Sequence, residues 1–362
     1  MKITRRSVLG KAAAVLATSA AVDSSTAQAP APGAAPQDFF LRLLKSSNDS
    51  VARLLQQEAE TLRPRPARVG RGETLAALVA AYCAPESSYY RAESLIPLME
   101  SAAQVFVSAQ NQDGTLDAGN LASPPDTGFV VEGLAASLAV LRQAQDPRLA
   151  PTEETLRKFL LAAGEALVTG GVHTPNHRWV ICNALARIHS LFPAAKYLNR
   201  IDDWLGEGVF IDADGQFEER STGIYSRVTV NAFVTLARLL NRPELLEPVR
   251  RNLDMTLYYL HPDGEVETVA SRRQDQNMAV SVSNYYLQYR YLAIRDNEPR
   301  YAAVARLIES KPGEGVVPRP WCAISISPAT PSKARTTRAT TSTFFQRWTT
   351  SRISPWMTAL TW

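Results

Sequence analysis

Apolar residues recur at helical spacing through the middle of the chain, and strand-like alternation is nearly absent. The clearest stripes comprise Leu246, Val249, Leu253, Leu257 and Leu260; Ile181, Leu185, Ile188 and Phe192; and Val130, Leu134, Leu138 and Leu141. Residues three or four apart share one face of a helix, so each stripe predicts an amphipathic helix. Further helices are expected near residues 37–60, 74–84, 90–109, 152–169, 226–240, 277–292 and 298–309. The pattern predicts an all-α protein.

A short motif repeats between these segments. Asp-Gly, a variable residue, an apolar residue and an acid occur in this order at 113–117, 214–218 and 263–267. The Asp residues are 101 and 49 positions apart, which corresponds to two periods and one period of about 50 residues. Glycine accepts a positive φ, so Asp-Gly favours a tight turn. We therefore expect each motif to form a turn between one helix and the next.

A second set of residues has the same period. Asp126 and Asn176 are 50 residues apart, Tyr225 follows after 49, and Asn277 after a further 52. A repeat of this length holds two helices and two loops, and such a helix pair buries its apolar face only against neighbouring pairs. Ring closure would give an (α/α) toroid and an open array a solenoid, and the period does not distinguish them. We favour the toroid, in which these residues would gather at one end and line a cleft.

The densest polar cluster contains Asn176 together with His173, His177, Arg178 and Trp179. Asn176 is suited to a helix N-cap, but a helix start explains none of the other four side chains. We predict that Asn176 and His177 act in catalysis and that the other three bind substrate. Core packing is an equally good explanation for Trp179.

Two further clusters precede predicted helices. In one, adjacent acids and Arg220 lead to Tyr225, and in the other Arg272 and Arg273 lie in a polar stretch. We predict that Tyr225 is catalytic and that the three arginines, together with Asp126, bind substrate. A packed tyrosine and a solvated loop are the alternatives.

Residues 1–29 have the pattern of a twin-arginine export signal. An arginine pair precedes a weakly apolar stretch that is too short to span a bilayer, and small residues suited to a signal peptidase follow. We expect recognition by the twin-arginine translocase, a periplasmic or secreted location, and no stable membrane insertion after cleavage. Residues 30–36 are predicted to be a linker, and residues 37–311 the toroid.

Residues 312–362 differ from the rest of the chain. From Gly315 onward there is no Asp or Glu, and there are six Lys or Arg. We expect a disordered or frameshifted tail, with a natural acid-free tail as the alternative. Residues 1–29 carry a net charge of +3 and residues 315–362 a net +6, so the overall +4 leaves a net −5 for residues 30–314. An acidic body gives no support for nucleic-acid binding, and three widely spaced Cys form neither a disulfide framework nor a zinc pattern.

The predicted site residues suit β-elimination from a uronic-acid glycan. That reaction requires neutralisation of the uronate carboxylate, removal of the C5 proton and protonation of the leaving oxygen. Asn and Arg side chains can stabilise the carboxylate and its developing charge, His can act as a base, and Tyr as an acid or a base. The set supplies each role without a metal or another cofactor.

The stretch from Asp113 to about Gln276 resembles the heparinase II/III-like polysaccharide lyases. The similarity rests on Thr-Pro-Asn-His-Arg-Trp at 174–179, on Glu-Arg-Ser-Thr-Gly-Ile-Tyr at 219–225, and on the hairpin layout. It implies an (α/α) toroid acting on an acidic polysaccharide or oligosaccharide. It also implies that Asn176 neutralises the carboxylate while His177 and Tyr225 serve as base and acid. The family usually continues into a C-terminal β-sandwich, sometimes with a zinc site, whereas this sequence becomes atypical near residue 312.

Two other functions fit the same pattern. A glycoside hydrolase on a toroid needs two carboxylates, for which Asp117, Asp126, Glu218 and Glu219 are candidates. A non-catalytic helical array that binds glycans is the third possibility.

Overall fold

The structure is a computed structural model and describes residues 36–57, 69–119, 121–311, 316–317 and 325–326. The described residues all fall in one compact unit. The predicted export signal and nearly all of the predicted linker and tail lie outside them, so those boundaries stay predictions. Within the described part of the chain, none of the helices combines the length and apolarity needed to traverse a bilayer.

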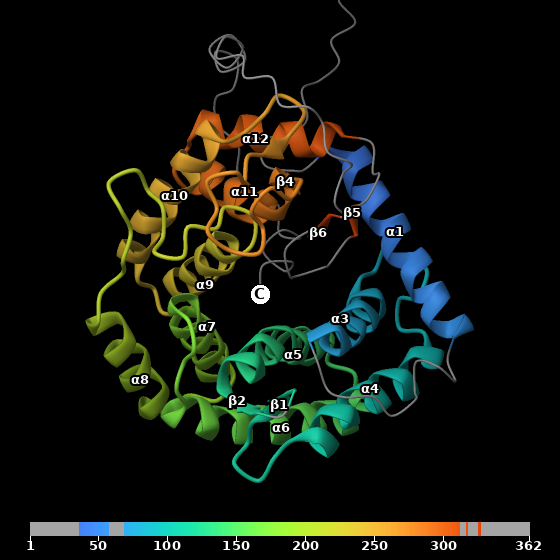
Figure 1. Cartoon of the computed structure of the whole chain (residues 1–362). Helices are drawn as coiled ribbons and strands as arrows, with labels where there is room; N and C mark the ends of the chain where they lie inside the picture. The colour runs from blue at the N-terminus through green and yellow to red at the C-terminus, as the bar shows by residue number, and fades with distance from the viewer. Residues whose placement is uncertain (1–35, 58–68, 120, 312–315, 318–324, 327–362) are drawn as a thin grey trace, which may run out of the picture. The chain divides into compact units, whose positions relative to one another are not determined.

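The unit is built from α-helices, which confirms the predicted all-α class (Figure 1). The α-helices are α1 (Gln37–Gln56), α3 (Val69–Cys83), α4 (Ile96–Ala109), α5 (Pro124–Ala144), α6 (Ala150–Thr169), α7 (Pro175–Leu191), α8 (Ala195–Gly206), α9 (Tyr225–Leu239), α10 (Glu247–Tyr258), α11 (Tyr286–Arg295) and α12 (Pro299–Ser310). The 3-10 helices are η1 (Glu93–Leu95), η2 (Pro147–Leu149), η3 (Pro243–Leu246) and η4 (Val282–Tyr285). Three antiparallel pairs join β1 (Leu116–Ala118) to β2 (Leu121–Ser123), β3 (Glu265–Val266) to β4 (Val280–Ser281), and β5 (Val316–Val317) to β6 (Ser325–Ile326).

The helices alternate between an inner and an outer position. Helices α3, α5, α7, α9 and α11 contact one another in sequence, and each packs against the following helix, α4, α6, α8, α10 or α12. In Figure 1 the labels α3, α5, α7 and α9 surround the centre, and α4, α6, α8 and α10 lie outside them. Each helix pair therefore covers its apolar face with its neighbours, as expected for repeated hairpins.

The ring is closed by α1, which packs against α3 and also contacts side chains or backbone of α11 and α12. Phe39 packs edge-on against Tyr286 of α11 at 5.3 Å between ring centroids, and Arg42 donates a 2.6 Å hydrogen bond to the carbonyl of Glu309 on α12. The Glu309 side chain is 1% exposed, accepts a 2.8 Å bond from the Tyr286 hydroxyl and lies 3.8 Å from Arg290. The chain thus forms an (α/α) toroid, as predicted.

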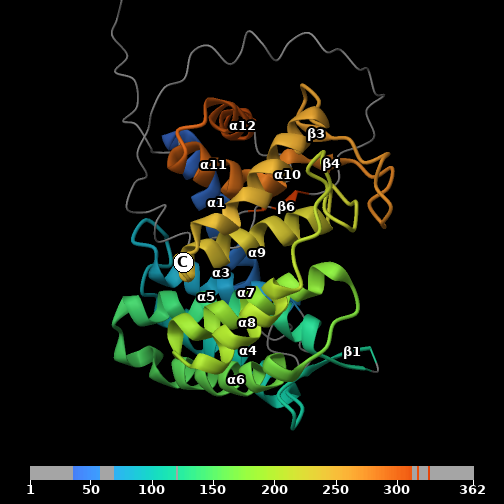
Figure 2. The same cartoon turned by 90° about the vertical axis from the view of Figure 1, so that its left-hand side faces the viewer.

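All connections from an outer helix to the next inner helix lie at the end of the ring where the inner helices begin. They comprise residues 110–123, 170–174, 207–224 and 259–281. In Figure 2, β1, β3 and β4 accordingly project from the same side of the unit. This end carries most of the irregular backbone, and loops placed on a rigid scaffold commonly carry function.

The three predicted Asp-Gly turns lie in these connections and share one hydrogen-bond pattern. In each turn, the glycine N–H donates a bond to the carbonyl of the residue three positions earlier. The N–H of that earlier residue donates a bond to the carbonyl of the residue after the glycine. These bonds are 2.8–3.1 Å long. Gly114, Gly215 and Gly264 have φ values of 91°, 92° and 82°. The turn prediction is therefore confirmed, and the positive φ explains the glycine.

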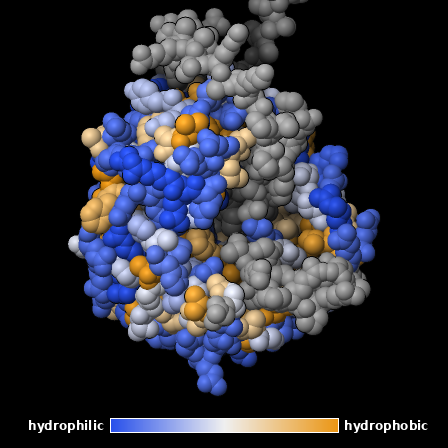
Figure 3. Space-filling view, in the orientation of Figure 1, coloured by the Kyte–Doolittle hydropathy of each residue, from blue (hydrophilic) through white to orange (hydrophobic). Residues whose placement is uncertain are grey.

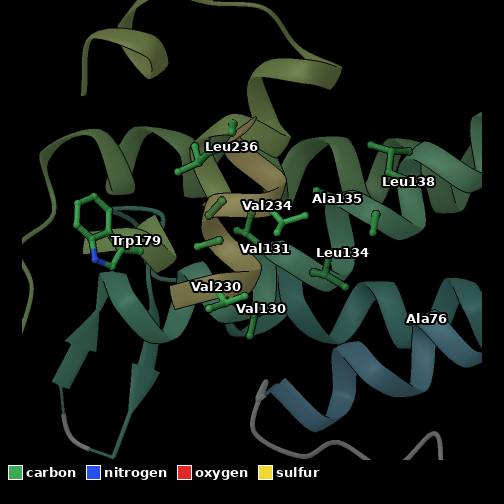
Figure 4. Packing of buried hydrophobic residues seen from close by; sticks show 14 of the residues in the cluster. Ala76, Val130, Val131, Leu134, Ala135, Leu138, Trp179, Val230, Val234 and Leu236 are labelled. Atoms are coloured by element: carbon green, nitrogen blue, oxygen red, sulfur yellow. The ribbon is translucent and has the colours of Figure 1, made fainter. Parts of the chain in front are cut away.

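The core lies between the inner helices and between the two rings. Figure 4 shows buried apolar side chains that include Ala76 of α3, Leu134 and Leu138 of α5, and Val230 and Val234 of α9. All of these side chains are buried. The inner helices are apolar on several sides because they contact both ring neighbours and an outer helix.

Two details of the helix prediction were wrong. Helix α8 was not anticipated, because only Tyr197, Ile201 and Trp204 are buried among its charged residues. The expected helix at 277–292 begins only at residue 282, because Asn277 takes a φ of 61° and Val280–Ser281 pairs with β3.

The glycine turn at 215 provides a test of the packing between a connection and an outer helix. A Cβ on Gly215 would lie 2.4 Å from the carbonyl oxygen of Arg251 on α10, whereas Gly208 has a similar φ of 87° and no atom within 4 Å of such a Cβ. We expect Gly208→Ala to lower the free energy of unfolding by about 1 kcal/mol, from the positive φ alone. Gly215→Ala should lower it by about 2–4 kcal/mol, because α10 must also shift. Urea denaturation measures the free energy of unfolding of both variants. Equal decreases in the two variants would contradict the argument that Gly215 packs closely against α10.

Ring closure gives a second prediction. Burial raises the pKa of the Glu309 carboxyl, and Arg290, Tyr286 and Arg306 oppose that shift. Glu309→Gln removes the negative charge beside buried Arg290, so we expect the free energy of unfolding to fall by about 3 kcal/mol. Asp49→Asn breaks an exposed pair with Lys45 and should cost less than about 0.5 kcal/mol. If the two variants were equally stable, closure would not depend on Glu309.

Candidate functional site

The first turns of α5, α7 and α9 carry the residues that the sequence places in phase. Asp126 is exposed at the start of α5, where its N–H and its carboxylate both bond to the Ser123 hydroxyl, at 3.3 and 2.6 Å. Asn176 and Tyr225 occupy the first turns of α7 and α9. Because the inner helices begin at the same end of the ring, these positions share one end of the unit. Asn277 is different, since it lies in a loop before β4 rather than at a helix start.

Asn176 is held in place by two neighbours. Its backbone N–H donates a 3.0 Å bond to Oε1 of Glu219, and its side-chain oxygen accepts a 2.7 Å bond from the Thr174 hydroxyl. Both Asn176 and Glu219 are buried. The Thr174 bond identifies Oδ1 as the acceptor end of the amide. The other end, the Nδ2 donor of Asn176, has no hydrogen-bond partner within the described residues. The amide is therefore oriented with a donor available for a ligand.

His177 lies in a group of charged and aromatic side chains. Its ring meets those of His173 and Phe129 edge-on, at 5.7 and 6.2 Å between centroids. Burial lowers the pKa of His177 below its ordinary 6.5, the imidazole of His173 and the guanidinium of Arg273 lower it further, and the Asp126 carboxylate opposes them. The imidazole is thus neutral at pH 7 and able to accept a proton.

Tyr225 is positioned by both of the loops that flank it. The Tyr225 N–H donates a 3.0 Å bond to the Ser221 hydroxyl, and the Tyr225 hydroxyl donates a 2.9 Å bond to Oε1 of Gln274. The guanidinium of Arg273 stacks 4.6 Å from the Tyr225 ring centroid, and its Nε lies 3.7 Å from Oε2 of Glu219. Arg273 therefore links the tyrosine to the carboxylate that holds Asn176.

A buried carboxylate fixes the two loops to each other. Asp275 is fully buried, and it accepts a 2.8 Å bond from the Gly223 N–H and a 2.5 Å bond from the Ser271 hydroxyl. A Cβ on Gly223 would lie 2.7 Å from Val280 and 2.9 Å from Asp275, so glycine permits this close approach. The position of Arg273 thus depends on Asp275.

The other predicted substrate-binding residues have different surroundings. Arg178 is 7% exposed and bonds at 3.1 Å to Glu207, and Trp179 is buried against Phe233 with 4.7 Å between ring centroids. Arg220 lies 3.6 Å from the Asp212 carboxylate. Arg272 is exposed, and its backbone N–H donates a 2.8 Å bond to the backbone carbonyl of Arg220. Their predicted binding roles stay predictions.

Sequence reasoning gave Glu219 a role only in the hydrolase alternative and did not single out Gln274 as a contact of Tyr225. Adjacent acids at 218 and 219 gave no sign of which one is buried. Only the fold distinguishes the two acids, because Glu219 accepts a bond from the backbone N–H of Asn176, which lies 43 residues earlier in the sequence.

Several polar atoms of this region are buried without a hydrogen bond in the described structure. They are Nδ2 of Asn176, Nδ1 of His177, and Oε2 of Glu219 with Nε of Arg273, which form an ion pair at 3.7 Å. A buried polar atom without a hydrogen bond costs about 1–3 kcal/mol, so a water or ligand that bonds to Nδ2 of Asn176 and Nδ1 of His177 would be stabilising. Among the described residues, no set of three or more His, Cys, Asp or Glu is arranged to hold a metal.

No protein-family model matches the chain, and no curated protein sequence matches it. Solved structures resemble it at low identity. A sugar epimerase from a ruminal bacterium is 11% identical with a TM-score of 0.46, over 68% of this chain and 75% of that one. A chondroitin AC lyase from Streptomyces coelicolor A3 in complex with chondroitin sulphate is 16% identical with a TM-score of 0.49, over 75% and 40%. A heparinase III is 11% identical with a TM-score of 0.44, over 66% and 40%, so the match covers less than half of either lyase.

The surroundings of His177 predict opposite effects of two variants on its titration. His173→Gln removes a neighbour that lowers the pKa of His177, so the midpoint should rise toward the ordinary 6.5. Asp126→Asn removes the carboxylate that raises it, so the midpoint should fall further. Histidine ring signals followed by NMR across pH give both midpoints. Shifts in the same direction would mean that these two groups do not face His177.

Proposed function

We propose that the protein is an exported polysaccharide lyase that cleaves uronic-acid-containing glycans by β-elimination. The observation that supports this most strongly is that Nδ2 of Asn176 and Nδ1 of His177 are buried without a hydrogen bond in the described structure, with the Arg273 guanidinium and the Tyr225 hydroxyl at the same end of the ring. Two donors, a neutral imidazole and a phenol are the groups that the reaction requires.

The proposed reaction assigns one task to each group. Nδ2 of Asn176 and the Arg273 guanidinium bind the uronate carboxylate and stabilise the charge that develops on it. His177 accepts the C5 proton, and the electrons of that C–H bond form the C4–C5 double bond. The C4–O bond breaks, and the leaving oxygen takes the proton of the Tyr225 hydroxyl. A low pKa at His177 keeps this base unprotonated at neutral pH.

The electrostatics of the ring support an acidic substrate. Helices α5, α7 and α9 direct their N-termini to this end, and the N-terminus of a helix carries a partial positive charge that favours anions. Figure 3 shows that the described surface around the ring in this orientation is largely hydrophilic, as expected for a surface that meets a solvated glycan.

A glycoside hydrolase is the second candidate, because Glu219 is a buried carboxylate with one oxygen that makes no hydrogen bond, and Asp126 lies near enough to His177 to affect its pKa. Hydrolysis needs two carboxyl groups, one as acid and the other as base or nucleophile. It would release reducing sugar without forming a double bond, so the product distinguishes the two reactions.

Two variants of the full chain test the lyase. Tyr225→Phe and His177→Ala should each lower kcat by about 10²–10⁴-fold on acidic glycans, because each removes a proton-transfer group. Turnover is followed by the ultraviolet absorbance of the unsaturated uronate product. Tyr258→Phe, at a tyrosine that is 91% exposed, is the matched control and should leave kcat unchanged.

The unmodified chain is assayed first on a panel of uronate glycans. If none of these glycans gives the absorbance of the unsaturated product, the lyase proposal is ruled out. Reducing ends that form without this absorbance, and that depend on Glu219, would instead establish the hydrolase.

A further inference from the structure

The connection between α8 and α9 lines an open hollow beside the candidate site. It has a volume of about 430 Å³ and is lined by Val209, Phe210, Ile211, Asp212, Gln216, Phe217, Glu218 and Arg220. Small-ligand sites commonly have volumes of about 300–1,000 Å³. The hollow is therefore large enough for a sugar ring.

Phe210 gives this hollow a fixed aromatic face. It is 57% exposed, which is unusual for a large apolar side chain in this protein. The guanidinium of Arg178 lies 5.4 Å from its ring centroid, and Arg178 is itself buried and bonded to Glu207. The negative face of an aromatic ring attracts the polarised C–H groups of a pyranose. Phe210 is thus a stacking platform that is already held in position.

Gln216 supplies a polar group in the same hollow. Its side chain is 7% exposed, and its Nε2 atom is buried without a hydrogen-bond partner in the described residues. Its backbone is fixed, since its N–H donates a 2.8 Å bond to Oδ1 of Asp212. A buried donor without a partner is destabilising, so a ligand hydroxyl or ring oxygen that accepts this bond would be favoured.

The charges around the hollow are paired. Arg220 lies 3.6 Å from the Asp212 carboxylate, and Glu218 lies 3.8 Å from Arg178. With each carboxylate beside an arginine, these residues present no excess charge to an ionic ligand, and the carboxylates can accept bonds from sugar hydroxyls. The hollow therefore suits an uncharged sugar, in contrast to the cationic group at Arg273.

The two sites share one stretch of backbone. Glu219 turns to the N–H of Asn176, whereas its neighbours Glu218 and Arg220 line the hollow. Consecutive Cα atoms are about 3.8 Å apart, so the two sites are separated by a single layer of chain. One glycan could occupy both.

We propose that the hollow at Phe210 binds an uncharged pyranose of the glycan, adjacent to the uronate at the candidate site. This proposal rests on the proposed function for the identity of the neighbouring sugar. The sugar at Phe210 stacks on the aromatic ring and accepts a bond from Nε2 of Gln216. The substrate class is then a glycan in which uronates adjoin neutral sugars.

Two ligands that differ at one carbon test the proposal. Methyl β-glucoside and methyl β-glucuronide are titrated into the full chain, and binding is followed by NMR. The glucoside should bind more tightly than the glucuronide, and Phe210→Ala and Gln216→Leu should each weaken it about tenfold. Tyr258→Ala, at another exposed aromatic residue, should leave the affinity unchanged.

A Tyr225→Phe variant separates this proposal from the proposed reaction. It should bind the glucoside as the unmodified chain does, because Tyr225 does not line the hollow. Equal affinity for the two glycosides, or equal affinity in Phe210→Ala and Tyr258→Ala, would overturn the subsite. Glucoside binding that depends on Phe210 in a chain with no lyase activity would retain the subsite and reject the lyase.

Discussion

Closure of the ring through α1 is the contact on which the rest of the fold depends. Each helix pair has an apolar face that only a neighbouring pair can bury, so the last pair needs the first. Phe39 covers Tyr286, and Arg42 bonds to the backbone of Glu309, which lies 267 residues away in sequence. Closure also places the N-terminal ends of the inner helices around a common centre. An open array of the same pairs would spread them along a line.

Parallel inner helices then determine where polar side chains can meet. Because the long connections lie at one end, residues from α7 and from the loops before α9 and η4 come together there. The contacts that hold them are carboxylates rather than apolar packing. Glu219 binds the first turn of α7, and Asp275 joins the loop at Gly223 to that at Ser271. Apolar packing builds the ring, and buried carboxylates position the site.

The sequence predicts the ring better than the site. Period and Asp-Gly turns identify the helix pairs, because both depend on local propensity and burial. Closure by Phe39 depends on a distant partner, and the period gave no information about it. The repeat period correctly places Asn176 and Tyr225 at one end of the ring, but it does not predict the contacts of their neighbours. Successive residues on a helix point about 100° apart, so Arg178 and Trp179 follow His177 in sequence yet contact Glu207 and Phe233.

The end of the ring that bears these residues carries a cost in stability that the core does not explain. Nδ2 of Asn176 and Nδ1 of His177 are buried without a hydrogen bond in the described structure, at about 1–3 kcal/mol each. Arg220 and Asn277 hold φ values of 46° and 61°, and a non-glycine residue in this region costs about 1–3 kcal/mol. Both lie in the loops that carry Tyr225 and Arg273. A ligand that pairs these atoms recovers part of that cost, which favours a binding role here whichever reaction follows.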